Sequence, residues 1–366
     1  MTDTEAAENE IPEHFDFTRH ADDERVNQAW SDVQAELDKT LVIAFLGTAS
    51  SGKTSGIKAL FDIDMGDISP IPGSTKNVKY KAIKERVSVA DAPGFRDINQ
   101  DVSAKAHEIL QDVDVFIYVL NSEGGFKQPE KNDYEACRAF GRPVLVVMNK
   151  VDLLRPDDVD EFLRDQCEKL GVPQKDFVAV AFDPHPAIAS EPQNLVAVEN
   201  WLTDTLRQHG KGLLLAKALR EKGRACGRLI KRATASAAAI GATPIPGSDY
   251  VPLTAVQMRL IASIAAVYDH ELSKTDAIAF LTDVVLSQAG RQIFRVAITA
   301  LKASGWIPGG QAVEVAAVAL GSAIAASVTY GVGKAAQAYY KSGMTMSVPD
   351  LQDIFQAAYE LRRQES

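Results

Sequence analysis

The sequence has few of the residues that mark secreted or metal-binding proteins. It contains only three cysteines, Cys137, Cys167 and Cys226, which lie far apart and form no C-x-x-C pair. Neither a disulfide framework nor a zinc site is therefore expected. Residues 1–20 lack the apolar run of a secretory signal, and their Asp, Glu and Pro content predicts a disordered acidic leader over residues 1–22. We accordingly expect a cytoplasmic protein.

An excess of basic residues is also missing. The chain carries 39 Lys and Arg against 49 Asp and Glu, which gives a formal net charge of -10. Because binding to a phosphate backbone depends on clustered Lys and Arg, we expect no nucleic-acid partner. The length of 366 residues is too great for one small core and indicates two domains.

Short apolar runs alternate with helical stretches in the first half of the chain. Runs of this kind are typical of buried parallel strands. Strands that alternate with helices predict an α/β fold with a doubly wound, mostly parallel sheet, in which ligands bind beyond the carboxyl ends of the strands. A helix is expected over residues 24–39, before the first strand. The apolar runs cover residues 41–46, 87–90, 113–120, 144–148 and 177–181.

Three of these runs end in a motif, and a fourth motif, Ser74-Thr75, lies between the first two. The first, GTASSGKT from Gly47 to Thr54, matches the pattern G-x-x-x-x-G-K-[ST]. Backbone N–H groups of such a loop, and the amino terminus of the helix that follows, hold phosphate groups. The motifs after the later runs are DAPG from Asp91 to Gly94 and NKVD from Asn149 to Asp152. Predicted phosphate contacts are Gly47, Ser50, Ser51, Gly52, Lys53, Thr54 and Ser55.

The residue types in these motifs also predict a magnesium site. Lys53 supplies a positive charge to the β and γ phosphates, and the hydroxyl of Thr54 is a suitable ligand for Mg²⁺. Asp91 is expected to hold the same ion through water, while the N–H of Gly94 reaches the γ phosphate.

The NKVD motif predicts which base is bound. The carboxylate of Asp152 can accept two hydrogen bonds from the ring N–H and the exocyclic amine of guanine, a pair that adenine lacks. The predicted ligand is therefore GTP or GDP. Asn149 is expected to brace the loops, and the stem of Lys150 to cover the base plane. Residues 180–182 match the usual Ser-Ala-Lys element poorly, so that only Ala181 is predicted there as a base contact.

Residues 41–183 resemble a TRAFAC-class GTPase of the Era and TrmE type. Besides the motifs above, residues 72–75 (Pro-Gly-Ser-Thr) match the Pro-Gly-Thr-Thr switch element of that family. The resemblance implies that Thr75 is the switch threonine on Mg²⁺ and acts with Lys53 in catalysis. The phosphate loop also resembles the dynamin type, in which a serine at the position of Ser50 orients the reaction and binds a monovalent cation, K⁺ or Na⁺. Potassium-dependent TrmE relatives have Asn at this position, which leaves cation dependence open.

The residue after DAPG bears on the rate of hydrolysis. A Ras-like enzyme has there a Gln that orients the attacking water, whereas this chain has Phe95. Because a phenyl ring cannot hold water by hydrogen bonding, we expect slow intrinsic GTP hydrolysis. Self-association across the nucleotide face, a monovalent cation or a partner would then complete the site.

The second half of the chain is richer in Ala, Gly, Ser and Val and predicts an all-α, hydrophobic helical domain. Two Ile-Pro-Gly turns, at residues 245–247 and 307–309, each precede a long apolar helix. Residues 220–345 resemble, through these turns, the domain of unknown function 697. The expected domains are a GTP-binding domain with its preceding helix over 23–208, a helical domain of two helix-turn-helix units over 209–345, and an amphipathic helix or tail over 346–366.

Membrane contact is left open by two features of this half. Residues 315–333 carry no charge, but their small side chains favour a buried helix over a membrane span. The basic residues that precede the apolar block form either a solvated helix face or a contact with anionic lipid. They are Arg220, Lys222, Arg224, Arg228, Lys231 and Arg232.

Three functions are compatible with the sequence. The first is a GTP-dependent switch that moves the helical domain against a partner or the inner face of a membrane, with a second copy of the chain, membrane lipids or a membrane protein as partners. The second is a dynamin-like, self-assembling GTPase that remodels or tethers membranes. The third, an Era-like role in ribosome assembly, is disfavoured by the acidic charge and the lack of a G-x-x-G loop in a basic setting.

Overall fold

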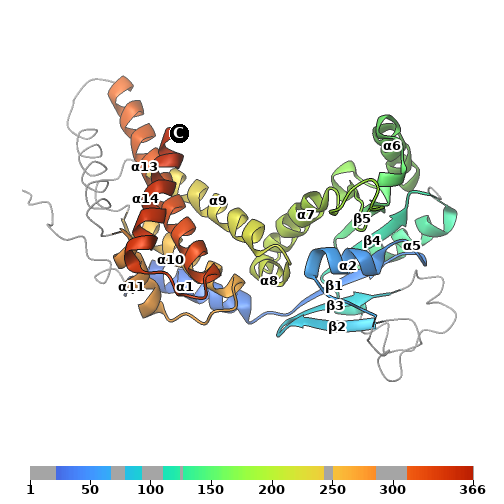
Figure 1. The fold of residues 1–366 in the computed structure, drawn as a ribbon, viewed down its shortest axis with the longest axis horizontal. Coiled ribbons are helices and arrows are strands. Elements are labelled where there is room, and N and C mark those ends of the chain that lie inside the picture. The colour runs from blue at the N-terminus through green and yellow to red at the C-terminus, as the bar shows by residue number, and fades with distance from the viewer. Residues whose placement is uncertain are drawn as a thin grey trace, which may run out of the picture. The chain divides into compact units, whose positions relative to one another are not determined.

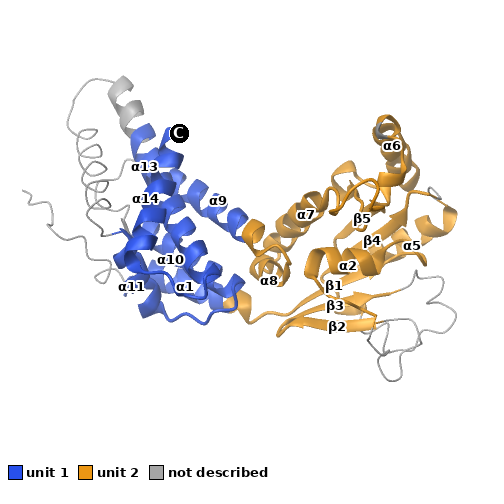
Figure 2. Cartoon of the chain, viewed as in Figure 1, with its two compact units in different colours: residues 1–34, 226–366 blue, residues 35–225 orange. Residues whose placement is uncertain are grey.

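The chain divides into two compact units, which Figure 2 shows in different colours. Residues 35–225 form one, here called the sheet unit, and residues 1–34 with 226–366 form the other, the helical unit. The computed structural model describes residues 22–66, 79–92, 110–123, 127–242, 250–285 and 311–365.

A six-stranded sheet forms the centre of the sheet unit (Figure 1), with the strand order β2-β3-β1-β4-β5-β6. Every neighbouring pair is parallel except β2 with β3. The predicted doubly wound, mostly parallel sheet is therefore confirmed. The strands are β1 (Leu41–Leu46), β2 (Lys79–Lys84), β3 (Val87–Asp91), β4 (Val115–Asn121), β5 (Val144–Asn149) and β6 (Phe177–Ala179).

The central strands are buried on both faces. On one face Ala44, Tyr118 and Val146 belong to an apolar core that includes residues of α5 and α6. On the other face Phe45 packs edge-on against Phe61 of α2, with ring centroids 6.4 Å apart. Because neighbouring side chains point to opposite faces, burial of both faces requires a continuous apolar run. The helices of this unit are α2 (Lys53–Phe61), α5 (Gln128–Ala139), α6 (Val159–Leu170), α7 (Leu195–Gln208) and α8 (Gly212–Ala218).

Strand β2 is absent from the runs that the sequence predicts. It lies at the edge of the sheet, pairs antiparallel with β3, and has no fully buried residue. Its sequence, KYKAIK, alternates lysine with apolar residues. This alternation is typical of an antiparallel strand with one solvated face. Because the strand contains no continuous apolar run, it is not among the predicted strands.

The sheet unit extends beyond residue 208, where the sequence places the domain boundary. The ammonium of Lys211 lies 2.5 Å from Oδ1 of Asp114, and the amide of Leu213 donates to Oε1 of Glu36 at 2.8 Å. The leucines of α8 are buried. These contacts hold residues 209–225 to the sheet unit, so that the two units divide at residue 225 instead.

Part of the predicted basic cluster is used inside the sheet unit. Arg224 donates to both carboxylate oxygens of Glu199, at 2.7 and 3.2 Å, and the Glu199 side chain is only 1% exposed. Hydrogen bonding to this carboxylate raises the pKa of Arg224. Arg224 is therefore anchored to α7 rather than presented as a free basic side chain.

The helical unit includes most of α1, which the sequence analysis assigns to the GTP-binding domain. Asp32 of α1 pairs with Arg259 at 3.5 Å, and Asn27 accepts a hydrogen bond from Lys274 at 2.6 Å. Polar contacts thus hold α1 to helices far along the chain. The described helices of this unit are α1 (Glu24–Leu37), α9 (Lys222–Gly241), α10 (Tyr250–Val267), α11 (Lys274–Val285), α13 (Gln311–Lys341) and α14 (Val348–Gln364), and α1 and α9 both continue into the sheet unit.

The uncharged segment 315–333 lies within α13, which packs along α10 and α14. Val328 and Val332 of this segment are buried. Within the described ranges, no helix has both the length and the apolar character needed to cross a membrane. The burial of Val328 and Val332 agrees with the interpretation of this segment as a buried helix. The two Ile-Pro-Gly turns lie outside the described residues.

A pair of glycine substitutions tests how closely α13 packs on α14. A Cβ added at Gly331 would lie 2.7 Å from Cδ2 of the buried Phe355 and 3.0 Å from its carbonyl oxygen. We expect Gly331→Ala to lower the free energy of unfolding by about 1–3 kcal/mol, because a ring and a backbone must both shift.

The control is Gly227→Ala on α9, where nothing lies within 4 Å of the added Cβ. Since alanine favours helix over glycine, this variant should gain about 0.5–1 kcal/mol. Urea unfolding followed by circular dichroism measures both variants. Equal effects of the two substitutions would contradict the close packing of α13 on α14.

Candidate functional site

The GTASSGKT loop joins β1 to α2, and its two end glycines have backbone angles that other residues rarely adopt. Gly47 has φ +144° and Gly52 has φ +97°. A Cβ at Gly47 would collide with the carbonyl oxygen of Val119, and one at Gly52 with the side-chain amide of Asn149. Both glycines therefore allow the turn and also allow a neighbouring group, the Val119 carbonyl or the Asn149 amide, to lie close to the loop backbone. Ser50 is also left-handed, with φ 61°.

Lys53 and Thr54 begin α2 directly behind this loop. The ammonium of Lys53 donates to the carbonyl oxygens of Gly47 and Thr48, each at 2.9 Å. The hydroxyl of Thr54 donates to Oδ2 of Asp91 at 2.9 Å. The carboxyl ends of β1 and β3 thus bring the two predicted magnesium ligands together, although 37 positions separate them in the sequence.

Asn149 links the phosphate loop to the loop after β6. Its Nδ2 donates to the carbonyl oxygen of Ser51 at 2.8 Å, and its Oδ1 accepts from the amide of Phe182 at 3.0 Å. The side chain is buried, with only 3% of the residue exposed. Hydrogen bonds at such a depth do not compete with water, so the three segments have fixed positions relative to one another.

The other residues of the NKVD motif lie at the mouth of a cavity. Lys150 is left-handed (φ 66°), and Asp152 lies in the short 3₁₀ helix Val151–Leu153. The Asp152 carboxylate accepts a hydrogen bond from the amide of His185 at 3.1 Å. This nucleotide pocket has a volume of about 470 Å³ and is lined by Ser50, Gly52, Lys53, Thr54, Ser55, Asn149, Lys150, Asp152, Leu153, Asp183 and His185.

The loop after β6 contains Ala181, the predicted base contact, but does not bring it to the lining of the pocket. Ala181 is 1% exposed, its amide donates to the carbonyl of Gln193 at 3.3 Å, and it does not line the pocket. Asp183 and His185 line it instead, and sequence reasoning missed both. The sequence Asp-Pro-His-Pro over 183–186, which follows the predicted apolar run 177–181, is the turn signal that points to them.

Three predicted residues cannot be placed with the others. Thr75, Gly94 and Phe95 lie outside the described residues. The site described above therefore consists of the phosphate loop, Asp91, the NKVD segment and the loop after β6.

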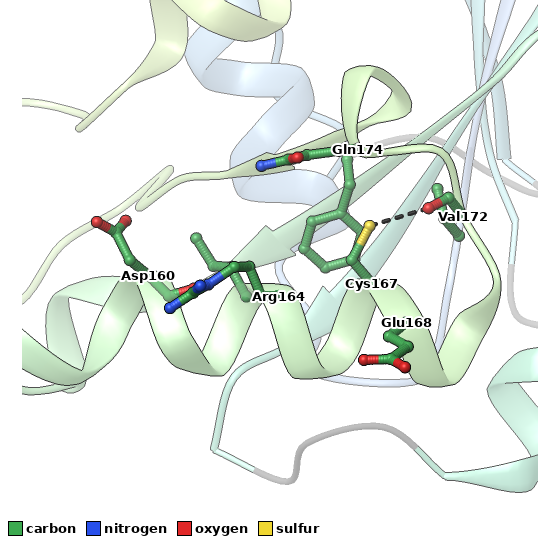
Figure 3. A pocket seen from close by; sticks show the side chains of 8 residues that line it. Asp160, Arg164, Cys167, Glu168, Val172 and Gln174 are labelled. Carbon is green, nitrogen blue, oxygen red and sulfur yellow. Dashed lines mark hydrogen bonds between the residues drawn. The ribbon is translucent and has the colours of Figure 1, made fainter.

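A second cavity, of about 630 Å³, lies beside α6 and the start of β6 and shares no residue with the nucleotide pocket. Figure 3 shows its lining, which includes Asp160, Arg164 and Glu168. Cys167 donates there from Sγ to the carbonyl of Val172 at 2.9 Å, and burial raises the pKa of its thiol. A thiol of raised pKa is a poor nucleophile. The larger cavity thus carries none of the predicted chemistry, whereas the smaller one does.

Comparison with protein families matches two parts of the chain. Residues 42–150 match the family model described as 50S ribosome-binding GTPase, and residues 210–364 match the domain of unknown function DUF697. The two matches fall on the parts of the chain that hold the nucleotide pocket and the apolar helices.

Curated relatives match part of the chain. The tRNA modification GTPase MnmE of Protochlamydia amoebophila is 30% identical over 121 residues, which are 31% of this chain and 26% of that protein. GTPase Era of Halothermothrix orenii is 26% identical over 142 residues, 37% of this chain and 48% of that protein. The chain thus spans about a quarter to a half of the length of these relatives. Among solved structures, Aquifex aeolicus Era bound to GDP·AlF4⁻ is 18% identical, with a TM-score of 0.30, and the match covers 39% of this chain and 52% of that one.

These comparisons overturn the expectation that no nucleic acid is a partner. A solved structure of Era in complex with part of the 16S ribosomal RNA is similar to 50% of this chain, at 20% identity and a TM-score of 0.30. The protein in that structure is called Era, as is one of the curated relatives described above. The acidic net charge does not exclude such a partner, because phosphate groups meet a local surface and not the charge of the whole chain.

Asn149→Ala tests the link between the two loops. The variant leaves the buried amide of Phe182 and the carbonyl of Ser51 without the partners they have now. We expect the free energy of unfolding to fall by about 2 kcal/mol, the cost of unsatisfied buried polar groups.

Ser51→Ala is the matched control for this experiment. The Ser51 hydroxyl is buried and has no hydrogen-bond partner within the described ranges, so its removal should cost nothing. Chemical unfolding of both variants beside the wild type supplies the comparison. A loss of stability in Ser51→Ala that equals the loss in Asn149→Ala would refute the role given to Asn149.

The motifs, their arrangement around one pocket and the family comparisons agree on the class of this protein. The chain contains a P-loop GTPase domain that is similar to GTPases of the Era and TrmE type, together with a DUF697 domain.

Proposed function

We propose that this protein binds GTP and GDP with Mg²⁺ in the nucleotide pocket, hydrolyses GTP to GDP and phosphate, and uses the difference between the two states to act on its helical unit. The observation that carries the proposal is the pair of hydrogen bonds made by Asn149. They join the proposed phosphate loop and the loop after β6 to the NKVD motif, around one pocket.

Phosphate binding is assigned to the loop between Gly47 and Lys53. The Lys53 ammonium already lies within the loop, on the carbonyl oxygens of Gly47 and Thr48. Phosphate oxygens would replace these neutral acceptors with charged ones, which form stronger hydrogen bonds with an ammonium group. Backbone N–H groups at the start of α2 add to the positive potential.

Thr54 and Asp91 are the described residues that fit a magnesium ion. They supply a hydroxyl and a carboxylate oxygen 2.9 Å apart, and Mg²⁺ prefers oxygen ligands in small number beside phosphates and water. Thr75 is proposed as a further ligand on the strength of the family resemblance. When bound, the ion would neutralise charge on the β and γ phosphates.

Guanine recognition is assigned to Asp152, with the loop after β6 beside it. The hydrogen bond from the amide of His185 orients the Asp152 carboxylate at the pocket mouth. The amides of Ala181 and Phe182 are both engaged, by Gln193 and Asn149 respectively. We therefore place Asp183, rather than Ala181, next to the base.

Hydrolysis by this site is proposed to be slow without help. Phe95 stands where a glutamine would orient the attacking water, and a phenyl group cannot take that role. Ser50 lines the pocket in a left-handed conformation, next to the position proposed for the phosphates. A monovalent cation held near Ser50, K⁺ or Na⁺, is the group that we propose to complete the site.

Asp152→Asn tests the assignment of the base. The carboxamide can donate where the carboxylate only accepts, so the variant should prefer xanthine nucleotides, which carry an oxygen in place of the exocyclic amine. We expect the affinity for GTP to fall by at least about 100-fold and that for XTP to rise, because a buried polar group is left unpaired in the wrong complex.

Titration with fluorescent GDP and XDP measures both affinities, and release of phosphate from GTP and XTP measures turnover. Asp157→Asn, at an exposed position in the 3₁₀ helix Pro156–Asp158, is the control and should keep the wild-type preference. An Asp152→Asn variant that binds GTP as the wild type does would sink the base assignment.

The hairpin of β2 and β3 supports the proposed link to the helical unit. It lies between the predicted switch residues Thr75 and Asp91 in the chain. At its turn, Arg86 donates to the carbonyl of Asp38 at 2.6 Å and pairs with the Asp38 carboxylate at 3.5 Å. Asp38 directly follows α1, which continues into the helical unit. A shift of the hairpin would therefore reach α1 through Arg86.

The second connection to the helical unit also touches elements of the nucleotide site. Helix α8 lies against β2 and β3, and the amide of Arg220, which follows α8, donates to the carbonyl of Leu60 in α2 at 2.8 Å. Helix α9 begins at Lys222 and continues into the helical unit. The β2–β3 hairpin, which carries Asp91, and α2, which carries Lys53 and Thr54, thus contact the two segments by which the chain passes into the helical unit.

Arg86→Ala tests the first of these routes. Amide hydrogen exchange in residues 24–37 is measured with GDP and with a non-hydrolysable GTP analogue bound. We expect the wild type to show a difference between the two states that shrinks by at least about half in the variant, because local openings report the contacts that hold a helix end. Nucleotide affinity should stay the same, since Arg86 does not line the pocket.

Arg142→Ala, at an exposed turn before β5, is the matched control. It removes one arginine from the same unit and should leave the exchange difference in α1 as in the wild type. Equal exchange with both nucleotides in the wild-type chain would be evidence against a switch that acts through α1.

A further inference from the structure

The segment Asn121-Ser122-Glu123 begins at the last residue of β4 and lies beside the NKVD motif. None of its residues is in the set predicted for the site. Asn121 and Asn149 are register partners in the parallel pair of β4 with β5. One residue further, the amide of Ser122 donates to the carbonyl of Asn149 at 3.0 Å. The pairing of β4 with β5 therefore places this segment next to the NKVD motif.

Ser122 holds the backbone of Lys150. Its Oγ donates to the carbonyl of Lys150 at 2.8 Å, and Ser122 is only 4% exposed. Lys150 has a φ of 66°, which residues other than glycine rarely adopt and which neighbouring contacts must maintain. The buried hydroxyl supplies such a contact at the residue where the chain turns toward Asp152.

Glu123 holds the other end of the same lysine. Its Oε2 accepts from the Lys150 ammonium at 2.9 Å and from Nδ2 of Asn121 at 3.1 Å, while its own amide donates to Oδ1 of Asn121 at 3.1 Å. Hydrogen bonds from Lys150 and Asn121 lower the pKa of the Glu123 carboxyl. The Glu123 carboxylate thus accepts hydrogen bonds from two side chains, and one of them, Lys150, lines the nucleotide pocket.

We propose that Asn121-Ser122-Glu123 is a positioning element for guanine nucleotides, in which Glu123 keeps the stem of Lys150 along the pocket wall where the base lies. A long lysine side chain loses rotational freedom when a ligand packs on it, and that loss opposes binding. Because Glu123 orders the side chain in advance, less freedom is lost on binding. This inference rests on the proposed binding of GTP and GDP and adds a residue that touches Lys150 rather than the ligand.

The size of the effect follows from the exposure of the pair. The side chains of Lys150 and Glu123 are 31% and 53% exposed, so water and salt weaken their attraction. Glu123→Gln should therefore weaken binding of fluorescent GDP by about two- to fivefold, the range that exposed ion pairs produce. Faster dissociation should account for most of this loss.

The experiment uses the full chain and stopped-flow dissociation of fluorescent GDP, at low and at high salt. Glu161→Gln, an exposed position on α6, is the control and should match the wild type throughout. The deficit of Glu123→Gln should vanish at high salt, since salt already screens the pair in the wild type. In a Lys150→Met background, which keeps the stem and removes the charge, Glu123→Gln should have no further effect.

Each outcome separates this inference from the proposed function. A wild-type chain that does not bind fluorescent GDP would remove the proposed function and this inference with it. A wild type that binds, with Glu123→Gln indistinguishable from Glu161→Gln at low salt, would overturn the inference alone. If Glu123→Gln does not fold, Glu123→Asp, which keeps the charge but shortens the reach, should show the same salt-dependent deficit, and its absence would overturn the inference.

Discussion

The hydrogen bonds of Asn149 are the interaction on which the rest of the site depends. One primary amide offers a donor to the phosphate loop and an acceptor to the loop after β6, and both bonds are buried. A side chain with only donors or only acceptors could not serve both loops. The phosphate loop and the loop after β6 are therefore linked through a single side chain. Lys150 and Asp152, which follow in sequence, take their places from it.

Parallel pairing of the strands explains why these loops meet. Strands β1, β3, β4 and β5 run in the same direction, so their carboxyl ends share one edge of the sheet. The phosphate loop, Asp91, the Asn121–Glu123 segment and the NKVD motif each follow one of these ends. The antiparallel pair of β2 with β3 departs from this pattern. It places the β2–β3 turn at the opposite end of the strands, where Arg86 contacts Asp38, the residue that follows α1.

Ala181 shows how a residue picked out by a weak motif match can lie away from the lining of the pocket. The weak Ser-Ala-Lys match is aligned on its alanine, yet that residue is buried and paired with Gln193. Backbone pairing across the loop decides which amide is left for a ligand, and pairing between residues distant in sequence cannot be read from three letters. Strand β2 was missed for a related reason. Its lysines interrupt the apolar run by which a buried strand is predicted, and the strand is held by its pairing with β3.

The sequence by itself determined the ligand class, the order of the strands that carry the motifs and the apolar character of the second half, because each of these depends on residues close together in the chain. Only the tertiary structure decided that the units divide at residue 225, that α1 goes with the helical unit, and that Ser122 and Glu123 hold Lys150. Lys211 with Asp114, Asp32 with Arg259 and Glu123 with Lys150 are far apart in the chain. The physical reason is that such contacts exist only after the strands and helices have packed.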